Sequence, residues 1–223
     1  MAKTKSVYFC NNCGAESPKW IGRCPVCGEW NTYVEEVVST KSAAGGRGEF
    51  GTMEQSKVRP QRIDDIQITE ESRIDLGNGE LNRVLGGGLV RGSLVLIGGE
   101  PGIGKSTLIL QTVLALKGQK VLYVSGEESA RQLKLRAERI GGNAPDCYIV
   151  CETSLEDIFV HIRNVDPDIV VIDSIQTIAT SAMESSPGSV GQVRECAASL
   201  LKFAKQTNTP VLLVGHINKE GSI

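Results

Sequence analysis

Apolar runs in the second half of the chain alternate with segments whose apolar residues recur at helical spacing. Five short runs predict buried strands; they are Leu94–Gly98, Val121–Ser125, Cys147–Cys151, Ile169–Asp173 and Val211–Gly215. The segments between them predict helices; these are Lys105–Lys117, Ser129–Ile140, Ser154–Asn164 and Val190–Thr207. Near-continuous apolar strands separated by helices indicate a mainly parallel sheet with helices on both faces. The pattern therefore predicts an α/β fold.

The first part of the chain does not follow this alternation. Residues 39–57 are rich in glycine, serine and small polar side chains, which is typical of a flexible linker. We therefore expect a small domain at residues 1–38 and a larger one at residues 58–223. Apolar residues return after the linker and are expected to pack against the larger domain; they are Ile63, Ile66, Ile68 and Ile74.

Two C-x-x-C pairs lie in the small N-terminal domain. Cys10 and Cys13 form the first pair, and ten residues later Cys24 and Cys27 form the second. A glycine directly follows each pair, as a tight turn with positive φ requires. Four thiolates would close a tetrahedral zinc site with no open position for catalysis. The metal would supply much of the folding free energy of so small a domain.

The pattern favours zinc, with two redox C-x-x-C motifs or an iron site as the alternatives. Trp20 and Trp30 are expected to pack around the metal site, and base stacking is the alternative role for them. The other three cysteines have no partner at metal-binding spacing and are predicted to be small buried hydrophobic residues; they are Cys147, Cys151 and Cys196.

Composition narrows the class of protein. The 223 residues carry a net charge of −2, so DNA binding would need a local patch rather than the overall field. No apolar run approaches the roughly 20 residues of a membrane span, and we expect no membrane partner. The odd number of cysteines, seven, and a start without the apolar core of a signal peptide favour a reducing cytoplasm.

The stretch LVLIGGEPGIGKST, at residues 94–107, reads as a strand, a glycine turn and a helix start. It fits the G-x-x-x-x-G-K-[ST] loop of P-loop nucleotidases, in which backbone N–H groups and a helix N-terminus face the phosphates. Lys105 would reach the β- and γ-phosphates of ATP, and the Ser106 hydroxyl would bind Mg²⁺. The predicted nucleotide-binding residues are Gly99, Glu100, Pro101, Gly102, Ile103, Gly104, Lys105, Ser106 and Thr107.

Further acidic residues follow predicted strands, at the sheet edge where ligands bind in such folds. Asp173 ends the run IVVID and would hold Mg²⁺ as the Walker B carboxylate. Glu127 and Glu128 follow VLYVS, and a carboxylate there can orient the water that attacks the γ-phosphate. Glu127 lies closer to the strand end and Glu128 suits a helix start, but spacing alone leaves the choice open, and the alternative is that both are helix-start acids. His216 follows PVLLVG and would sense the γ-phosphate, with a structural histidine as the alternative.

The order of these motifs is specific. The four-cysteine motif is followed by LGGGLVRGS, GGEPGIGKST, YVSGEES, VVIDSIQT, SSPGSVGQVRE and VGHINKEGS. This succession resembles the bacterial RadA (Sms) family of DNA repair proteins over nearly the whole chain. The resemblance implies a RecA-like ATPase that binds single-stranded or branched DNA and promotes branch migration as a homo-hexameric ring. It also implies that Glu127 is catalytic and that residues 181–192 take the place of the first DNA-binding loop.

The family continues beyond VGHINKEGS with further strands, a Lys-Asn-Arg-Phe-Gly motif and a Lon-protease-like domain. We therefore expect this chain to be an N-terminal piece, with ring assembly and full ATPase turnover in question. Two other functions stay open. One is a nucleotide-gated adaptor whose zinc ribbon recruits a helicase or recombinase, and the other is a RecA-like ATPase that acts on proteins.

Overall fold

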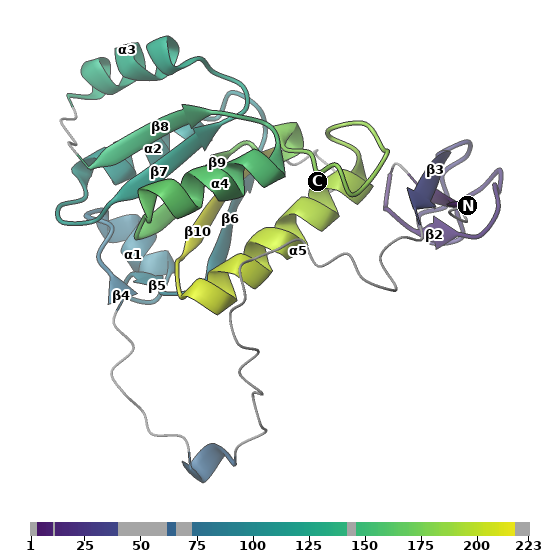
Figure 1. Ribbon diagram of the computed structural model, residues 1–223, viewed down its shortest axis with the longest axis horizontal. Helices are drawn as coiled ribbons and strands as arrows, with labels where there is room; N and C mark the ends of the chain where they lie inside the picture. Colours follow the sequence, from purple (N-terminus) through teal and green to yellow (C-terminus); the bar gives the residue numbers. More distant parts are fainter. Residues whose placement is uncertain (1–3, 11, 40–61, 66–72, 142–145, 217–223) are drawn as a thin grey trace.

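The computed structural model describes residues 4–10, 12–39, 62–65, 73–141 and 146–216 (Figure 1). The predicted linker, apart from its first residue, lies outside these ranges, as do Ile66 and Ile68. None of the described helices is long and apolar enough to cross a membrane.

The N-terminal domain is a three-stranded antiparallel sheet with two cysteine-bearing turns. Its strands β1 (Thr4–Cys10), β2 (Glu16–Ser17) and β3 (Tyr33–Ser39) lie in the order β2-β1-β3. Its small buried cluster consists of Cys10, Cys24 and Tyr33. The cysteines therefore occupy the place that a hydrophobic core would take in a larger domain.

The larger domain is built on a five-stranded parallel sheet, as predicted. Its strands are β6 (Leu94–Gly99), β7 (Val121–Ser125), β8 (Cys147–Cys151), β9 (Ile169–Asp173) and β10 (Val211–His216). The spatial order is β6-β10-β9-β7-β8, and every pair is parallel. All carboxyl ends of the strands therefore meet at one edge, and this edge carries the candidate site.

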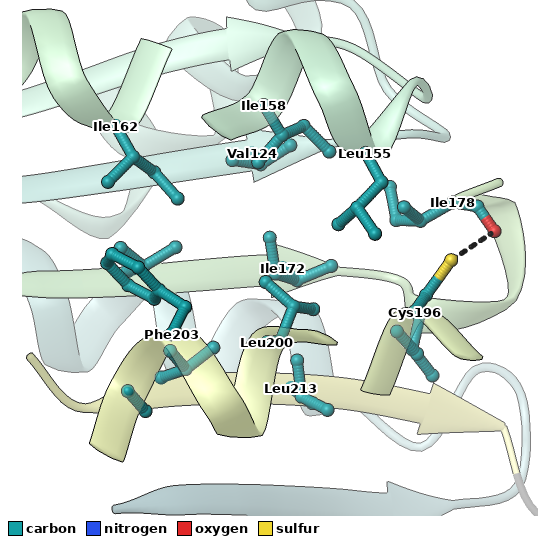
Figure 2. Close-up of a cluster of buried hydrophobic side chains, with 14 of the residues drawn as sticks. Val124, Leu155, Ile158, Ile162, Ile172, Ile178, Cys196, Leu200, Phe203 and Leu213 are labelled. Carbon is teal, nitrogen blue, oxygen red and sulfur yellow. Dashed lines mark hydrogen bonds between the residues drawn. The ribbon is translucent and has the colours of Figure 1, made fainter. Parts of the chain in front are cut away.

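Alternation along the strands assigns each side chain to a face. Leu122, Val124, Val170 and Ile172 face the helices α4 (Leu155–Val165) and α5 (Val190–Thr207). Figure 2 shows this layer, where Ile158 and Leu200 approach from the two helices and the Cys196 thiol donates to the Ile178 carbonyl oxygen at 3.7 Å. Cys196 is thus a buried small residue, as predicted.

The opposite face is covered by α2 (Lys105–Ala115) and α3 (Ala130–Ile140). Its buried cluster takes the alternate strand positions, among them Val121, Tyr123, Val171 and Val214. Because alternate residues of a strand face opposite sides of the sheet, only one of every two strand-end residues can reach the start of α2.

The helix boundaries follow local capping chemistry. Ser129 and Ser154, expected inside helices, are N-caps whose hydroxyls accept from Gln132 N–H and Asp157 N–H. Ser189 caps α5 in the same way, and Gly141 ends α3 with a φ of 78°. These caps place the helix starts within one residue of the predicted positions.

The segment before the sheet differs in part from the prediction. Ile74 is buried in β4 (Arg73–Ile74), which pairs with β5 (Leu89–Val90) around α1 (Gly79–Val84). Ile63, in the short 3-10 turn η2 (Ile63–Asp65), is 82% exposed and does not pack as expected. Cys151 is also exposed, because it ends the edge strand β8, so its prediction as a buried residue is wrong.

Candidate functional site: a nucleotide-binding edge and a four-cysteine cluster

The predicted phosphate loop connects the end of β6 to the start of α2. Gly102 and Gly104 have φ values of 80° and 99°, which L side chains rarely adopt, and residues 100–104 are exposed. Gly104 is the N-cap of α2, and no side chain of the described residues caps this helix start. The backbone N–H groups and the positive end of the helix dipole therefore remain for an anion.

Lys105 extends across this loop. Its ammonium donates to the carbonyl oxygens of Gly99 and Glu100, both at 2.8 Å, and lies 3.2 Å from Nδ1 of His216. The residue is 8% exposed, so the amine is held over the loop rather than in bulk solvent. Its position suits a contact to phosphate oxygens above the loop.

Asp173 is joined to the first turn of α2. It has the same strand parity as Val171, so its side chain lies on the α2 face of the sheet. The Ser106 hydroxyl donates to Asp173 Oδ1 at 3.0 Å, and the Tyr123 phenol donates to Asp173 Oδ2 at 2.6 Å. Burial and the neighbouring Asp173 charge raise the pKa of Tyr123, so the phenol stays protonated and continues to donate.

Glu127 and Glu128 have different partners, although they are adjacent. Glu127 accepts from the Ser174 hydroxyl at 2.5 Å and lies 3.3 Å from Nε2 of His216. Glu128 forms an ion pair with Arg136 of α3, and the backbone N–H of Glu128 donates to the Ser125 hydroxyl oxygen. Glu127 therefore faces the end of β9, whereas Glu128 forms its ion pair with α3.

His216 links Lys105 to Glu127. Its Nδ1 lies beside Lys105 and its Nε2 beside Glu127, and its backbone oxygen accepts from Gln176 Nε2 at 3.0 Å. Gln176 belongs to the 3-10 turn η3 (Ile175–Thr177), which follows β9. The ends of β9 and β10 are thus fixed to each other at the site.

Sequence reasoning missed three supporting residues. Tyr123 is hidden in a run of apolar positions, Ser174 reads as a turn residue, and Gln176 stands in a loop. The only signal was the phenol group of Tyr123 in the middle of an apolar run, at a position with the same parity as buried Val121. Such a group needs a buried hydrogen-bond partner, and Asp173 supplies one.

The predicted DNA loop is organised by a glutamine. Gln192 is buried, and its amide donates to the backbone oxygens of Thr180, Met183 and Ser185 at 3.0–3.2 Å. Its Oε1 accepts from the Thr180 N–H at 2.9 Å. The loop between η3 and α5 is therefore fixed to the first turn of α5.

The four cysteines of the N-terminal domain converge. Their sulfur atoms all lie within 4.8 Å of one another, with Cys10–Cys27 at 3.6 Å and Cys13–Cys24 at 3.5 Å. A tetrahedral zinc site with Zn–S bonds of about 2.3 Å places its sulfurs roughly 3.8 Å apart, so the cluster fits the metal.

Each cysteine turn is closed in the same way. The N–H of Gly14 donates to the Cys10 oxygen at 2.7 Å, and the N–H of Gly28 donates to the Cys24 oxygen at 2.9 Å. Both glycines have positive φ, 69° and 78°, which confirms the predicted turns. Burial by itself would raise the pKa of the Cys24 thiol, but hydrogen bonds from the N–H groups of Cys27 and Val26 outweigh it and lower the pKa to about 6. Burial raises the pKa of the Cys13 thiol in the same cluster to about 12, so the shifts favour the thiolate at Cys24 and not at Cys13.

The tryptophans do not pack around the cluster, so that prediction is wrong. Trp20 is 53% exposed and Trp30 is 67% exposed. Other side chains surround the cluster instead: Tyr33 is buried in it, and Tyr8, Ala15 and Ile21 pack against it.

Comparisons with known proteins agree with this division of the chain. A family model described as "AAA domain" matches residues 57–222, and one described as "Rubredoxin metal binding domain" matches residues 8–35. Over its whole length the chain is 54% identical to "DNA repair protein RadA" of Bacillus subtilis. It is 50% and 47% identical to the proteins of that name from Listeria monocytogenes and Pseudomonas aeruginosa. It covers 48–49% of these proteins and so spans about half the length of the curated relatives it matches.

Proposed function

The chain belongs to the AAA domain family and resembles RadA-type DNA repair proteins along its whole length, and on this premise we propose that it is a DNA-dependent ATPase of recombination and repair. The observation that carries the proposal is the meeting of Lys105, Ser106 and Asp173 at the carboxyl edge of a parallel sheet. Glu127 lies beside them through its contacts with Ser174 and His216.

ATP would bind with its phosphates over the glycine loop. The exposed N–H groups of residues 100–104 and the uncapped start of α2 would hold the β-phosphate. Lys105 would exchange its contacts with the Gly99 and Glu100 carbonyls for phosphate oxygens, which bear more negative charge. Asp173 and Ser106 would hold Mg²⁺, which neutralises charge between the β- and γ-phosphates.

Glu127 would orient the water that attacks the γ-phosphate. Ser174 fixes one carboxylate oxygen of Glu127, and His216 approaches the same oxygen while its other nitrogen faces Lys105. This arrangement would let His216 register the presence of the γ-phosphate through Lys105. The second carboxylate, Glu128, would serve to position α3 through Arg136.

Hydrolysis would be coupled to DNA through the loop at residues 181–192. Gln176 contacts the backbone of His216 at the nucleotide edge, and the loop that follows η3 is tied to α5 by Gln192. A change at the γ-phosphate would therefore be transmitted to the loop through His216 and Gln176. We propose that alternating grip on single-stranded or branched DNA, in a homo-hexameric ring of the intact protein, drives branch migration.

The zinc ribbon would be structural. Its four thiolates would use every position of a tetrahedral metal, and the described part of the domain buries only four hydrophobic residues, two of them cysteines. Zinc would replace the missing core, and no redox step is assigned to it.

The test is ATP hydrolysis with and without single-stranded DNA. We expect stimulation by DNA in the unmodified chain and no turnover in Lys105→Ala, with unchanged zinc content in both. Lys117→Ala, beyond the far end of α2, is the matched control and should hydrolyse ATP normally. Equal turnover by Lys105→Ala would overturn the nucleotide site.

Two other outcomes separate the alternatives. Hydrolysis without stimulation by DNA would favour a nucleotide-gated adaptor whose ribbon recruits a helicase or recombinase. Transfer of phosphate to a protein, with no affinity for DNA, would favour an ATPase that acts on proteins.

A further inference from the structure

The ribbon exposes the only two tryptophans of the chain. Trp20 and Trp30 are 53% and 67% exposed, although an indole is among the largest apolar groups a domain can bury. Neither ring belongs to the buried cluster of Cys10, Cys24 and Tyr33. Neither ring is therefore needed to close the metal site.

The two rings are neighbours across Gly22. A Cβ at Gly22 would lie 3.6 Å from Cη2 of Trp20 and 4.0 Å from Cζ3 of Trp30. The six-membered parts of both indoles therefore approach the same backbone position, and the glycine keeps that position free of a side chain. Two aromatic rings beside an open backbone position form one continuous surface rather than two scattered apolar residues.

Cationic groups accompany the rings. The Arg23 guanidinium lies over the Trp30 ring, 5.7 Å from its centroid, and Arg23 Nε donates to the Gly28 oxygen at 2.9 Å. Lys19 is exposed and directly precedes Trp20. Neither Lys19 nor Arg23 forms an ion pair with a carboxylate among the described residues. Aromatic faces with nearby cations suit bases and the phosphates that join them.

The ribbon is attached next to the predicted DNA loop. Arg194 of α5 donates to the Gly14 oxygen at 2.8 Å and to the Cys13 oxygen at 3.3 Å. Arg194 lies in the first turns of α5, which begins at Val190 directly after the loop fixed by Gln192. Figure 1 shows the ribbon beside this end of α5. A strand held by the loop would therefore pass close to the ribbon.

We propose that Trp20 and Trp30 form a stacking platform for the unpaired bases of single-stranded DNA, with Arg23 and Lys19 contacting its phosphates. The platform deepens the proposed function, because it gives the DNA a second contact on the ribbon. It does not depend on ATP hydrolysis. The zinc turns fix the backbone that carries both rings.

Tryptophan fluorescence tests the platform directly, because both tryptophans of the chain belong to it. We expect oligo(dT) added to the zinc-loaded chain to quench the emission, at the same concentrations at which anisotropy of a labelled oligo(dT) reports binding. Trp20→Ala and Trp30→Ala should each weaken binding about 5- to 150-fold, the range typical of losing one stacked base. Tyr148→Ala, an exposed aromatic residue on β8, is the control and should bind normally.

Several results would overturn the platform. One is binding seen by anisotropy without any change in tryptophan emission. Another is unchanged affinity in both alanine variants with full zinc content. Either result would indicate that the two tryptophans contact a protein partner instead of DNA. Failure of the proposed ATPase is a separate outcome, since quenching by oligo(dT) without DNA-stimulated hydrolysis would support the platform and count against the motor.

Discussion

Asp173 receives one hydrogen bond from the start of a helix and another from the middle of a neighbouring strand. Ser106 binds Oδ1, and Tyr123 binds Oδ2 from the inside of the sheet. A buried carboxylate with both oxygens bound keeps one orientation, which a metal ligand at a strand end requires. The orientation of Asp173 thus depends on Tyr123, which is itself fully buried.

Tyr123→Phe tests this support. Removing the hydroxyl leaves Asp173 Oδ2 without its buried donor, so we expect a loss of about 1–3 kcal/mol in the free energy of unfolding and weaker Mg²⁺-dependent ATP binding. Urea denaturation and nucleotide titration measure the two effects. Tyr148→Phe on the neighbouring strand should change neither, because Tyr148 is half-exposed. Wild-type stability in Tyr123→Phe would contradict the role.

The two adjacent glutamates offer a matched pair for the hydrolytic step. Glu127→Gln should lower turnover by about 10²- to 10⁴-fold while ATP still binds, because an amide orients the attacking water poorly. Glu128→Gln should keep most of the turnover, since its partner is Arg136 rather than a group at the strand ends. Single-turnover hydrolysis and nucleotide binding distinguish them. A larger loss in Glu128→Gln would reverse the assignment.

At the scale of elements, the loop before α5 is ordered by one buried amide. Both polar atoms of the Gln192 side-chain amide, Oε1 and Nε2, form hydrogen bonds with the backbone of residues 180–185. A loop bound at several points moves as a unit with the helix that anchors it. This property would suit the proposed role of the loop, in which its grip on DNA changes with the bound nucleotide.

Gln192→Leu should release that loop. The backbone groups of Thr180 would lose their buried partners, which we expect to lower the free energy of unfolding by about 1–3 kcal/mol and to speed amide exchange across residues 180–185. Gln206→Leu, exposed near the end of the same helix, is the control. Equal exchange in the two variants would show that the amide does not hold the loop.

At the scale of the whole molecule, Arg194 of α5 joins the two domains by its hydrogen bonds to Gly14 and Cys13. Gly14 is suited to this contact, since a Cβ there would lie 2.6 Å from the Arg194 guanidinium and 2.7 Å from Cγ1 of Val190. The turn that carries Cys10 and Cys13 is therefore also the part of the ribbon that contacts α5. Loss of the metal should loosen the ribbon and its contact together.

Arg194→Ala should undock the ribbon while leaving zinc bound. Both hydrogen bonds to the first cysteine turn would be lost, so amide exchange should increase at residues 12–15 and 190–194 without a change in zinc content. Lys202→Ala, exposed further along α5, provides the comparison. Unchanged exchange in Arg194→Ala would show that the contact does not hold the domains together.

The sequence by itself determined the strands, the helices, the glycine-rich loop before α2 and the two cysteine-bearing turns. Apolar runs predicted β7, β8 and β9 with their observed bounds, because buried parallel strands need continuous apolar residues. The loop and the C-x-x-C turns were readable because their glycines and ligands act at fixed spacing along the chain.

Only the tertiary structure decided which residues support the site. Strand order brings β10 between β6 and β9, so His216 meets Lys105 from a distant part of the sequence. The different partners of Glu127 and Glu128, the Tyr123 bond to Asp173 and the exposure of the tryptophans also depend on packing between elements. Spacing along a chain encodes local turns and periodicity. Contacts between elements, in contrast, depend on which helix and sheet faces pack against each other in the folded protein.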